Sequence, residues 1–346
     1  MNTSDLYACN PRQVKKFMGR ALFAGVVPYI SGQPGIGKSQ IVQEVAKAAN
    51  LEFIDLRLSM CDPTDLMGIP HVENNKAYWV PFNAFPTENT PIPQGKNGWL
   101  LMLDELSSAN KSIQAASYKL ILDRMVGQCK LHPRCYIVAA GNRTEDRAVA
   151  NRLSTALMSR MLQIHMTVSF DDWLKDVALK RNLDYRIIAF LNMYPDKLNT
   201  FDPESDNDTY ASPRTWEFLS WIIKDQTLDD ADLPMIAGLI DPGVAAEFLQ
   251  FTKVFNKIVS YEEIVKNPDN ALAKTDKNDV ELLYATTASI MQKIKKEDLI
   301  PVIKYISNLP QAFKLLACKG IFHQHNDFLI EPPARTLIGE ISESLK

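Results

Sequence analysis

The stretch Gly32-Gln-Pro-Gly-Ile-Gly-Lys-Ser39 fits the pattern G-x-x-x-x-G-K-[ST], and its surroundings decide the fold. An apolar run, Val26-Val-Pro-Tyr-Ile-Ser31, precedes it, and Gln40–Ala49 follows it with apolar residues at helical spacing. A strand, a glycine-rich turn and a helix in this order form a phosphate-binding loop, because the turn points backbone N–H groups inward and the helix adds its positive N-terminus. The sequence therefore predicts a phosphate site that comprises Gly32, Gln33, Pro34, Gly35, Ile36, Gly37, Lys38, Ser39 and Gln40.

Two side chains of this loop suit a magnesium nucleotide. We expect Lys38 to reach the β- and γ-phosphates and the Ser39 hydroxyl to bind Mg²⁺, which prefers hard oxygen ligands. The apolar run Trp99-Leu-Leu-Met-Leu-Asp-Glu105 ends in two carboxylates, as the end of a neighbouring strand should. Asp104 is the predicted second metal ligand, and Glu105 is the predicted group that polarises the water attacking the γ-phosphate.

Further apolar runs predict an α/β fold with a parallel sheet sandwiched by helices. The predicted strands besides Val26–Ser31 are Leu51–Leu58, Trp99–Leu103, Cys135–Ala140 and Met161–Met166. Helices are expected over Ile113–Met125 and over the segment that runs through Arg160 to the last strand. Residues 59–96 contain six prolines, which indicates an inserted loop region with at most a short helix or hairpin.

Strand signals stop after Val168, and a helical part of the chain follows. Apolar residues recur at helical spacing in Phe170–Arg181, Tyr185–Met193, Pro213–Lys224 and most of Met235–Lys346. Between them, Asp196–Ser212 is expected to be a polar loop. We therefore expect an α/β nucleotide-binding domain over residues 1–168, a first helical part over residues 169–225 and a helical C-terminal region over residues 226–346.

The composition excludes several classes of protein. The 346 residues are 46% hydrophobic and carry 38 Lys and Arg against 41 Asp and Glu, so the chain lacks the positive field of a dedicated nucleic-acid binder. The apolar runs are far shorter than the ~20 residues that span a bilayer, and Met1–Asp5 begins no signal peptide. The sequence therefore predicts a cytoplasmic protein without membrane insertion.

Taken together, these motifs resemble those of MoxR-type AAA+ ATPases, in the helix-2-insert clade of P-loop NTPases, over residues 10 to about 225. The resemblance implies a sensor at Asn142, which ends Ile137-Val-Ala-Ala-Gly-Asn142 and would hydrogen-bond the γ-phosphate or the water. It also implies an arginine finger at Arg160 that reaches the neighbouring subunit's site, with Arg152 as the alternative finger. Ser212-Pro213-Arg214 is similar to the sensor-2 motif, so Arg214 would contact the γ-phosphate from a helical lid over residues 169–225.

Two insertions of the family have counterparts here. Asp65-Leu-Met-Gly68 is similar to the start of the helix-2 insert, and Arg124–Lys130 resembles the pre-sensor-1 hairpin. These insertions make Tyr78, Trp79, Phe82 and Phe85 candidate partner contacts, with packing on their own domain equally open. Asp104-Glu-Leu-Ser-Ser-Ala109 departs from the Asp-Glu-Ile-Asn-Arg-Ala of many relatives, so any role of that Asn-Arg pair does not carry over.

The resemblance implies an ATP- and Mg²⁺-dependent ATPase that forms a ring, hexameric by expectation, and remodels a protein partner in a chaperone-like way. A protein with a von Willebrand factor A domain is the implied partner. A DNA-directed AAA+ motor or loader is one alternative, although the slightly acidic charge and the lack of a DNA-binding signature make nucleic acid an improbable partner. An ATP-binding switch with little turnover is the other alternative, and Glu105 counts against it.

Overall fold

The computed structural model describes residues 7–146 and 151–344, and the chain divides into two compact units. The first unit comprises Met1–Ser169 together with Asp202–Glu204, and the second comprises Phe170–Phe201 together with Ser205–Lys346.

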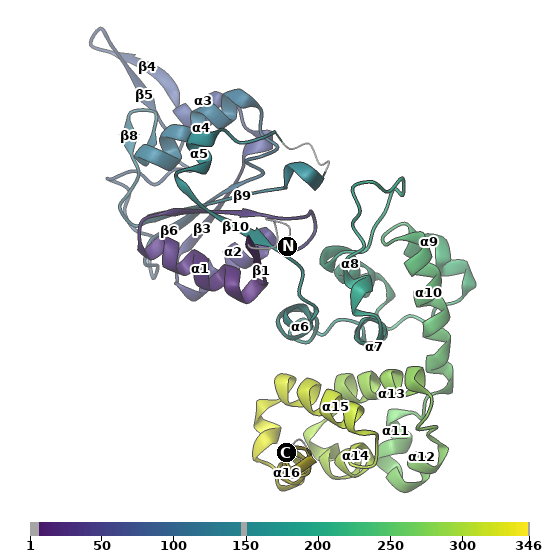
Figure 1. The fold of residues 1–346 in the computed structure, drawn as a ribbon. Helices are drawn as coiled ribbons and strands as arrows, with labels where there is room; N and C mark the ends of the chain where they lie inside the picture. The colour runs from purple at the N-terminus through teal and green to yellow at the C-terminus, as the bar shows by residue number, and fades with distance from the viewer. Residues whose placement is uncertain (1–6, 147–150, 345–346) are drawn as a thin grey trace. The chain divides into compact units, whose positions relative to one another are not determined.

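A six-stranded parallel sheet forms the centre of the first unit (Figure 1). Its strand order is β1-β10-β2-β9-β6-β3. Because all neighbouring strands are parallel, their carboxyl ends meet at one edge of the sheet. The strands are β1 (Ala8–Cys9), β2 (Val27–Ser31), β3 (Glu52–Arg57), β6 (Trp99–Asp104), β9 (Cys135–Gly141) and β10 (Met161–Met166).

Helices cover both faces of this sheet, so its central strands are buried on both sides and consist of continuous apolar runs. On one face, α1 (Pro11–Phe23) and α2 (Lys38–Ala48) pack on the sheet with one apolar cluster. On the other face, α4 (Lys111–Asp123) and α5 (Thr155–Met158) enclose a second cluster. Each fully buried aliphatic side chain contributes ~1.5–3 kcal/mol, so the two clusters stabilise the sheet from both sides. The predicted fold class is confirmed.

The region between β3 and β6 contains a short helix, α3 (Pro63–Met67), and a hairpin of β4 (Ile69–Glu73) and β5 (Lys76–Val80). The hairpin turns at Asn74 and Asn75, whose φ angles of 48° and 57° suit a two-residue hairpin loop. A smaller hairpin, β7 (Met125–Val126) and β8 (Cys129–Lys130), lies against this insertion. At Gly127, with φ of 57°, a Cβ atom would lie 2.3 Å from the Met67 carbonyl oxygen, so only glycine allows this contact.

Two features of the first unit differ from the sequence prediction. The predicted helix through Arg160 is wrong, because α5 is only four residues long, residues 151–154 before it are not helical, and Thr144–Asp146 forms only a 3-10 turn. The reason is tertiary: the Asn151 N–H donates to the Ser107 carbonyl at 2.6 Å, and the Asn151 side chain donates to the Ala109 carbonyl at 3.0 Å. Sequence reasoning also missed α1, although Asn10 and Gln13 form a capping box at its start.

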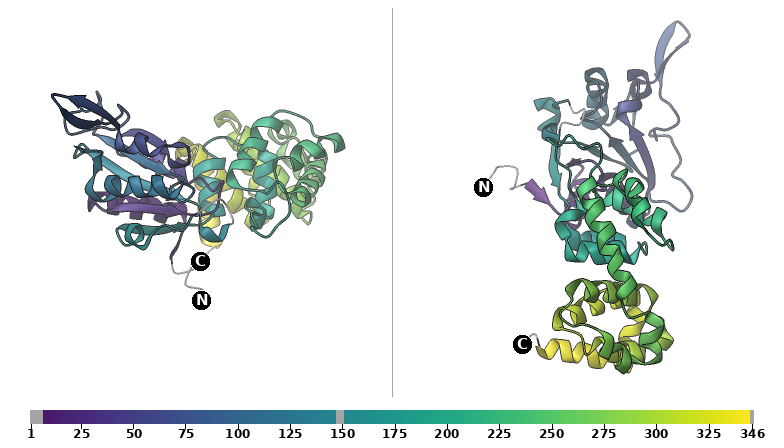
Figure 2. Two further views of the ribbon diagram at one scale, coloured as in Figure 1. Left: turned by 90° about the horizontal axis from the view of Figure 1, so that it is seen from above. Right: turned by 90° about the vertical axis from the view of Figure 1, so that its right-hand side faces the viewer.

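The regular secondary structure in the described part of the second unit is all helical, which confirms the helical C-terminal region (Figures 1 and 2). Aromatic rings of Phe190, Trp216, Phe248 and Phe251 form part of its core. Helices α7 and α13 pack on one another, and the division of this unit at residue 225 stays a prediction. The helices are α6 (Phe170–Trp173), which continues into a π-helical turn (Leu174–Ala178), α7 (Tyr185–Met193), α8 (Pro213–Ile223), α9 (Leu233–Ala237), α10 (Pro242–Thr252), α11 (Tyr261–Lys266), α12 (Pro268–Lys274), α13 (Val280–Lys293), α14 (Leu299–Ile306), α15 (Gln311–Gln324) and α16 (Pro332–Ser344).

Helices long and apolar enough to cross a bilayer are absent from the part of the chain that the structure describes.

Candidate functional site

The phosphate-binding loop connects the carboxyl end of β2 to the start of α2. Gly35 and Gly37 have φ angles of 78° and 92°, which favour glycine, and Lys38 is the first residue of the helix. At Gly32, a Cβ atom would lie 2.7 Å from the Met166 carbonyl oxygen of β10. The first N–H groups of an α-helix have no partner within the helix, so the loop presents them at the end of the sheet where the strands terminate.

The Lys38 ammonium group lies at the centre of this loop. Its Nζ donates hydrogen bonds to the Gly32 carbonyl at 2.7 Å, to the Gln33 carbonyl at 2.8 Å and to Asn142 Oδ1 at 3.0 Å. Asn142 follows β9, the strand next to β2 in the sheet. The predicted phosphate ligand and the predicted sensor are therefore in direct contact.

Ser39 and Asp104, the two predicted metal ligands, are also in contact. The Ser39 hydroxyl donates to Asp104 Oδ2 at 2.7 Å, and the Glu105 N–H donates to Asp104 Oδ1 at 2.8 Å. Asp104 is the last residue of β6, so the sheet holds its carboxylate beside the start of α2. The arrangement joins one hydroxyl and one carboxylate, both hard oxygen donors.

Glu105 has a backbone conformation that is unusual for a residue with a side chain. Its φ angle is 59°, in the left-handed region, and this turns the chain sharply after β6. Its carboxylate accepts a hydrogen bond from the hydroxyl of Ser59, which lies in a short 3-10 turn (Leu58–Met60) directly after β3. Sequence reasoning missed Ser59, because only the pairing of β3 with β6, with Arg57 opposite Asp104, brings the two side chains together.

A third carboxylate lies close to this pair. Burial raises the pKa of Asp55 on β3, and the negative charge of Asp104 adds to this effect, while Arg57 opposes it. The electrostatic potential at the ends of β3 and β6 is therefore negative, because the carboxylates of Asp55, Asp104 and Glu105 lie there. Such a concentration of negative charge favours a bound cation.

Asn142 is held from behind by the turn that follows β6. Its backbone N–H donates to the Ser107 hydroxyl at 2.9 Å. The Ser107 hydroxyl is also hydrogen-bonded to Tyr29. Burial raises the pKa of Tyr29 to about 12, although the hydrogen bond to Ser107 acts to lower it. A Cβ atom at Gly141 would lie 2.5 Å from both the Ser107 and the Tyr29 oxygens, so glycine is required beside this pair.

The described residues around these contacts match a known family. Residues 29–161 match the family of AAA domains described as the dynein-related subfamily. This part of the chain is an AAA domain. The matched range contains the phosphate-binding loop from Gly32 onwards, the two carboxylates at the end of β6, and both Asn142 and Arg160.

Solved structures with a similar chain include a presumed ATPase from Cytophaga hutchinsonii, with 15% identity, 95% of this chain and 89% of that chain covered, and a TM-score of 0.36. They also include a mutant of RuvB from Thermotoga maritima, which is 14% identical. That match covers 84% of this chain and 88% of the RuvB chain, with a TM-score of 0.37. Another structure of that protein, described as a Holliday junction branch migration motor, is 15% identical. The match covers 84% of this chain and 87% of that chain, with a TM-score of 0.35. No curated protein matches the sequence.

The remaining loop residues of the AAA domain have different environments. Ile36 is buried in the cluster under α1 and α2, so it anchors the loop to the core. Gln40 donates its amide to the Glu44 carboxylate at 3.4 Å on the same helix. Gln33 and Pro34 are half-buried, and the Gln33 carbonyl is one of the acceptors for Lys38.

The two candidate arginine fingers are both exposed on the AAA domain. Arg160 follows α5, and its guanidinium donates to the Ala156 carbonyl at 3.1 Å. Arg152 lies in the non-helical segment before α5 and lines a cavity of about 780 Å³ at the carboxyl edge. Asn142 lines the same cavity, so the structure brings the alternative finger and the predicted sensor to one hollow.

A pair formed by a buried serine and a half-buried histidine also lines this cavity. Ser31, the last residue of β2, is hydrogen-bonded to Nδ1 of His165 on β10 at 2.8 Å. Burial lowers the pKa of His165, and the positive charge of Arg143 lowers it further. The lowered pKa favours the neutral imidazole, so the pair adds hydrogen-bonding groups to the edge.

Arg214, the predicted sensor-2 residue, belongs to the second unit. It is exposed on the first turn of α8, which begins after Ser212 in a capping box with Thr215. A cation at a helix N-terminus is not stabilised by the helix dipole. Its contact with the phosphates remains a prediction, because Arg214 and the phosphate-binding loop belong to different units.

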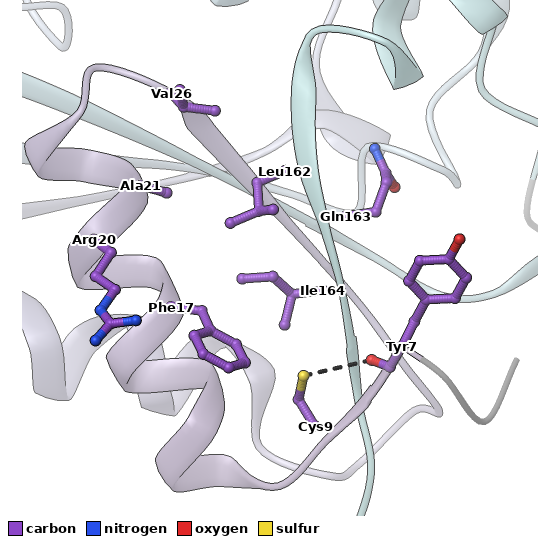
Figure 3. Close-up of a pocket in the computed structure, with 9 residues that line it drawn as sticks. All are labelled: Tyr7, Cys9, Phe17, Arg20, Ala21, Val26, Leu162, Gln163 and Ile164. Carbon is purple, nitrogen blue, oxygen red and sulfur yellow. Dashed lines mark hydrogen bonds between the residues drawn. The ribbon is translucent and has the colours of Figure 1, made fainter.

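A second hollow of the AAA-containing unit, of about 450 Å³, lies between α1 and the outer edge of β10 (Figure 3). Phe17 and Ala21 of α1 face Leu162 and Ile164 of β10 across it, and Arg20 stands at its rim. Its described lining contains none of residues 32–40. This apolar groove is therefore separate from the phosphate-binding site.

Proposed function

We propose that this protein is a ring-forming AAA+ ATPase of the MoxR type that uses ATP hydrolysis to remodel or activate a protein partner. The observation that carries the proposal is the convergence of five residues at one edge of the sheet. Lys38 contacts Asn142, Ser39 contacts Asp104, and Glu105 lies beside that carboxylate. A loop, a neighbouring strand end and a turn thus supply a phosphate ligand, a sensor, metal ligands and a base.

The residues at the edge fit Mg²⁺. Ser39 and Asp104 offer a hydroxyl and a carboxylate oxygen 2.7 Å apart. Burial, and after it the negative charge of Asp104, raises the pKa of nearby Asp55. Ser39 and Asp104 would hold the ion, which keeps several of its waters when it binds to few protein ligands. When bound, Mg²⁺ neutralises charge on the phosphate oxygens.

The chain's own groups then divide the reaction between them. Lys38 contacts the β- and γ-phosphates, and Asn142 hydrogen-bonds the γ-phosphate or the attacking water. Glu105 accepts the proton of that water as it attacks, and Ser59 orients the carboxylate that receives it. By the family resemblance, Arg214 is the proposed second sensor of the γ-phosphate.

Ring formation is part of the proposal, because an arginine finger acts on a neighbouring subunit. Arg160 is exposed, and its guanidinium donates through one of its N–H groups to a carbonyl of its own helix. A guanidinium carries five N–H donors in a fork, so the same side chain can also bind a phosphate. Six subunits are expected from the family resemblance. A protein with a von Willebrand factor A domain is the proposed partner, by the same resemblance.

The β4–β5 hairpin is the proposed partner surface. Tyr78 on β5 and Phe82, two residues after β5, are exposed, with 42% and 39% of their surface accessible. Phe85 is buried in the core of its own domain and is excluded from this surface. Trp79 is half-buried, with its Cβ 3.1 Å from a Cβ position at Gly127, so it fixes the hairpin to the smaller hairpin.

The Glu105→Gln protein provides the test. It should bind ATP with normal affinity and release phosphate ~10²- to 10⁴-fold more slowly, because the amide accepts no proton. Its solution mass, measured by light scattering at several concentrations with and without MgATP, should shift to that of a closed ring. The Glu88→Gln protein, which changes an exposed loop carboxylate, is the control and should behave as wild type.

Each alternative function predicts a different result. Wild-type turnover in Glu105→Gln would place the base elsewhere. A monomer in saturating ATP with negligible phosphate release by the wild type would favour an ATP-binding switch. Tight, salt-sensitive and sequence-independent DNA binding in ATP would favour a DNA-directed motor.

A further inference from the structure

Ser107 contacts several parts of the site, although the proposed reaction assigns it no role. It lies two residues after Glu105 and is 2% exposed. Its hydroxyl accepts the Asn142 N–H at 2.9 Å, and its carbonyl accepts the Asn151 N–H at 2.6 Å. One buried residue thus connects the turn that carries the base, the strand end that carries the sensor and the segment that leads to the fingers.

The packing around Ser107 allows its hydroxyl little freedom. Tyr29, also buried, is hydrogen-bonded to it. A Cβ atom at Gly141 would approach both oxygens to 2.5 Å, so the backbone of β9 fills the remaining space. The N–H of Leu106 donates to the Ala140 carbonyl at 2.9 Å and pins the turn to β9 a second time. The hydroxyl therefore has a fixed position relative to the end of β9.

The Ser107 hydroxyl holds the backbone N–H of Asn142, and so fixes the point from which the Asn142 side chain extends. Asn142 Oδ1 accepts from Lys38 at 3.0 Å, and a displacement of its backbone by a few tenths of an ångström would weaken this contact. We infer that Ser107 is a positioning residue, which holds the Asn142 amide in register with Lys38 and Glu105. The inference rests on the proposed function, in which Asn142 contacts the γ-phosphate or the water.

A buried hydroxyl also stabilises the fold, so the test must separate positioning from stability. Ser117 provides the matched control. It is fully buried in the same unit, and its hydroxyl donates to the Gln114 carbonyl at 2.8 Å within α4. Ser117→Ala removes a buried hydroxyl from the AAA domain without touching Asn142, so it reports the effect of stability alone.

The experiment compares the full-length wild type with Ser107→Ala, Asn142→Ala, the double variant and Ser117→Ala. The steady-state kcat and KM for MgATP, the ratio of ATP to ADP affinity and the thermal midpoint are measured for each. Ser107→Ala should lower kcat about tenfold and leave KM within about twofold, because a positioning effect acts on the reacting state. Tyr29→Phe should lower kcat in the same direction by a smaller factor, because it removes only one support of the hydroxyl.

The double variant separates a positioning role of Ser107 through Asn142 from an independent, structural role. If Ser107 acts through Asn142, the double variant should be no slower than Asn142→Ala alone, and its ATP-to-ADP affinity ratio should equal that of Asn142→Ala. Losses that multiply in the double variant would overturn the inference, as would an equal loss of kcat in Ser117→Ala. If the wild type binds ATP without turnover, the affinity ratio alone decides between these outcomes.

Failure of the proposed function has a different signature. A wild type that neither binds ATP nor releases phosphate would overturn the proposed function and the role of Ser107 with it. A normal wild type with multiplying losses would overturn only the role of Ser107.

Discussion

The carboxyl edge of the sheet and the β4–β5 hairpin belong to one unit but hold their side chains in opposite ways. At the edge, Lys38, Ser39 and Asn142 are each hydrogen-bonded to another element. On the hairpin, Ile69 and Val72 are 52% and 70% exposed, although both are apolar. The groups of the proposed reaction are thus fixed by several elements, whereas a two-stranded hairpin with exposed apolar residues suits contact with a partner.

The largest effect is expected at Lys38, whose ammonium group donates to two carbonyls of the loop and to Asn142. Lys38→Ala should weaken ATP binding by at least about 100-fold, because it removes the charge that faces the phosphates. Equilibrium binding of a fluorescent ATP analogue measures this. The control is Lys47→Ala at the exposed last turn of the same helix. Unchanged affinity in Lys38→Ala would remove the assignment of the edge as a phosphate site.

The second effect concerns the exposed arginine after α5. Arg160→Ala should lower turnover by ~10³-fold, the size known for arginine fingers, while ATP affinity is kept. Turnover should partly return when this variant is mixed with Lys38→Ala, whose intact finger completes the neighbouring site. If no mixing ratio restores phosphate release, the finger does not act in trans. Arg152→Ala, tested in the same way, decides between the two candidate fingers.

A smaller effect sharpens the description of the edge. Ser59→Ala should lower kcat by about threefold to tenfold at unchanged ATP affinity, because it removes the hydroxyl that donates to the Glu105 carboxylate and orients it. Ser112→Ala is the matched control, since that exposed hydroxyl donates to Asn110 Oδ1 at the start of α4. A kcat equal to that of the wild type would show that Glu105 is positioned without Ser59.

The smallest effect is expected on the hairpin. Tyr78→Ala should change the free energy of unfolding by no more than ~1 kcal/mol, the scale of one cross-strand pair, and leave basal phosphate release unaltered. Phe85→Ala should lower it by ~3–5 kcal/mol, because Phe85 is 4% exposed and its removal leaves a cavity. Denaturant titration measures both. Equal losses would show that the hairpin is part of the core, and the contrast between the edge and the hairpin would be wrong.

Sequence reasoning could find the residues that form a recognisable motif with their neighbours in the sequence. The glycines and Lys38 form a local pattern between a strand and a helix, and Asp104 and Glu105 terminate an apolar run. Asn142 required the family resemblance, because one asparagine after a strand has no specific spacing. All of these residues lie at the carboxyl edge, as parallel strands require.

The contacts that sequence reasoning missed depend on register between distant strands. Ser59 meets Glu105 only because Arg57 pairs with Asp104, a residue far along the chain. Ser107 and Tyr29 meet because β9 lies between their elements and has glycine at residue 141. The helix expected before β10 failed for a similar reason, since Asn151 exchanges helical hydrogen bonds for bonds to the turn at Ser107.

The left-handed backbone at Glu105 has a consequence for how this protein could evolve. A residue with a side chain loses roughly 1 kcal/mol at such a φ angle, whereas glycine adopts it freely. Glycine would therefore relieve the backbone at this position while removing the carboxylate that the proposed reaction uses as its base. Stability and the proposed turnover therefore make opposite demands on this one residue.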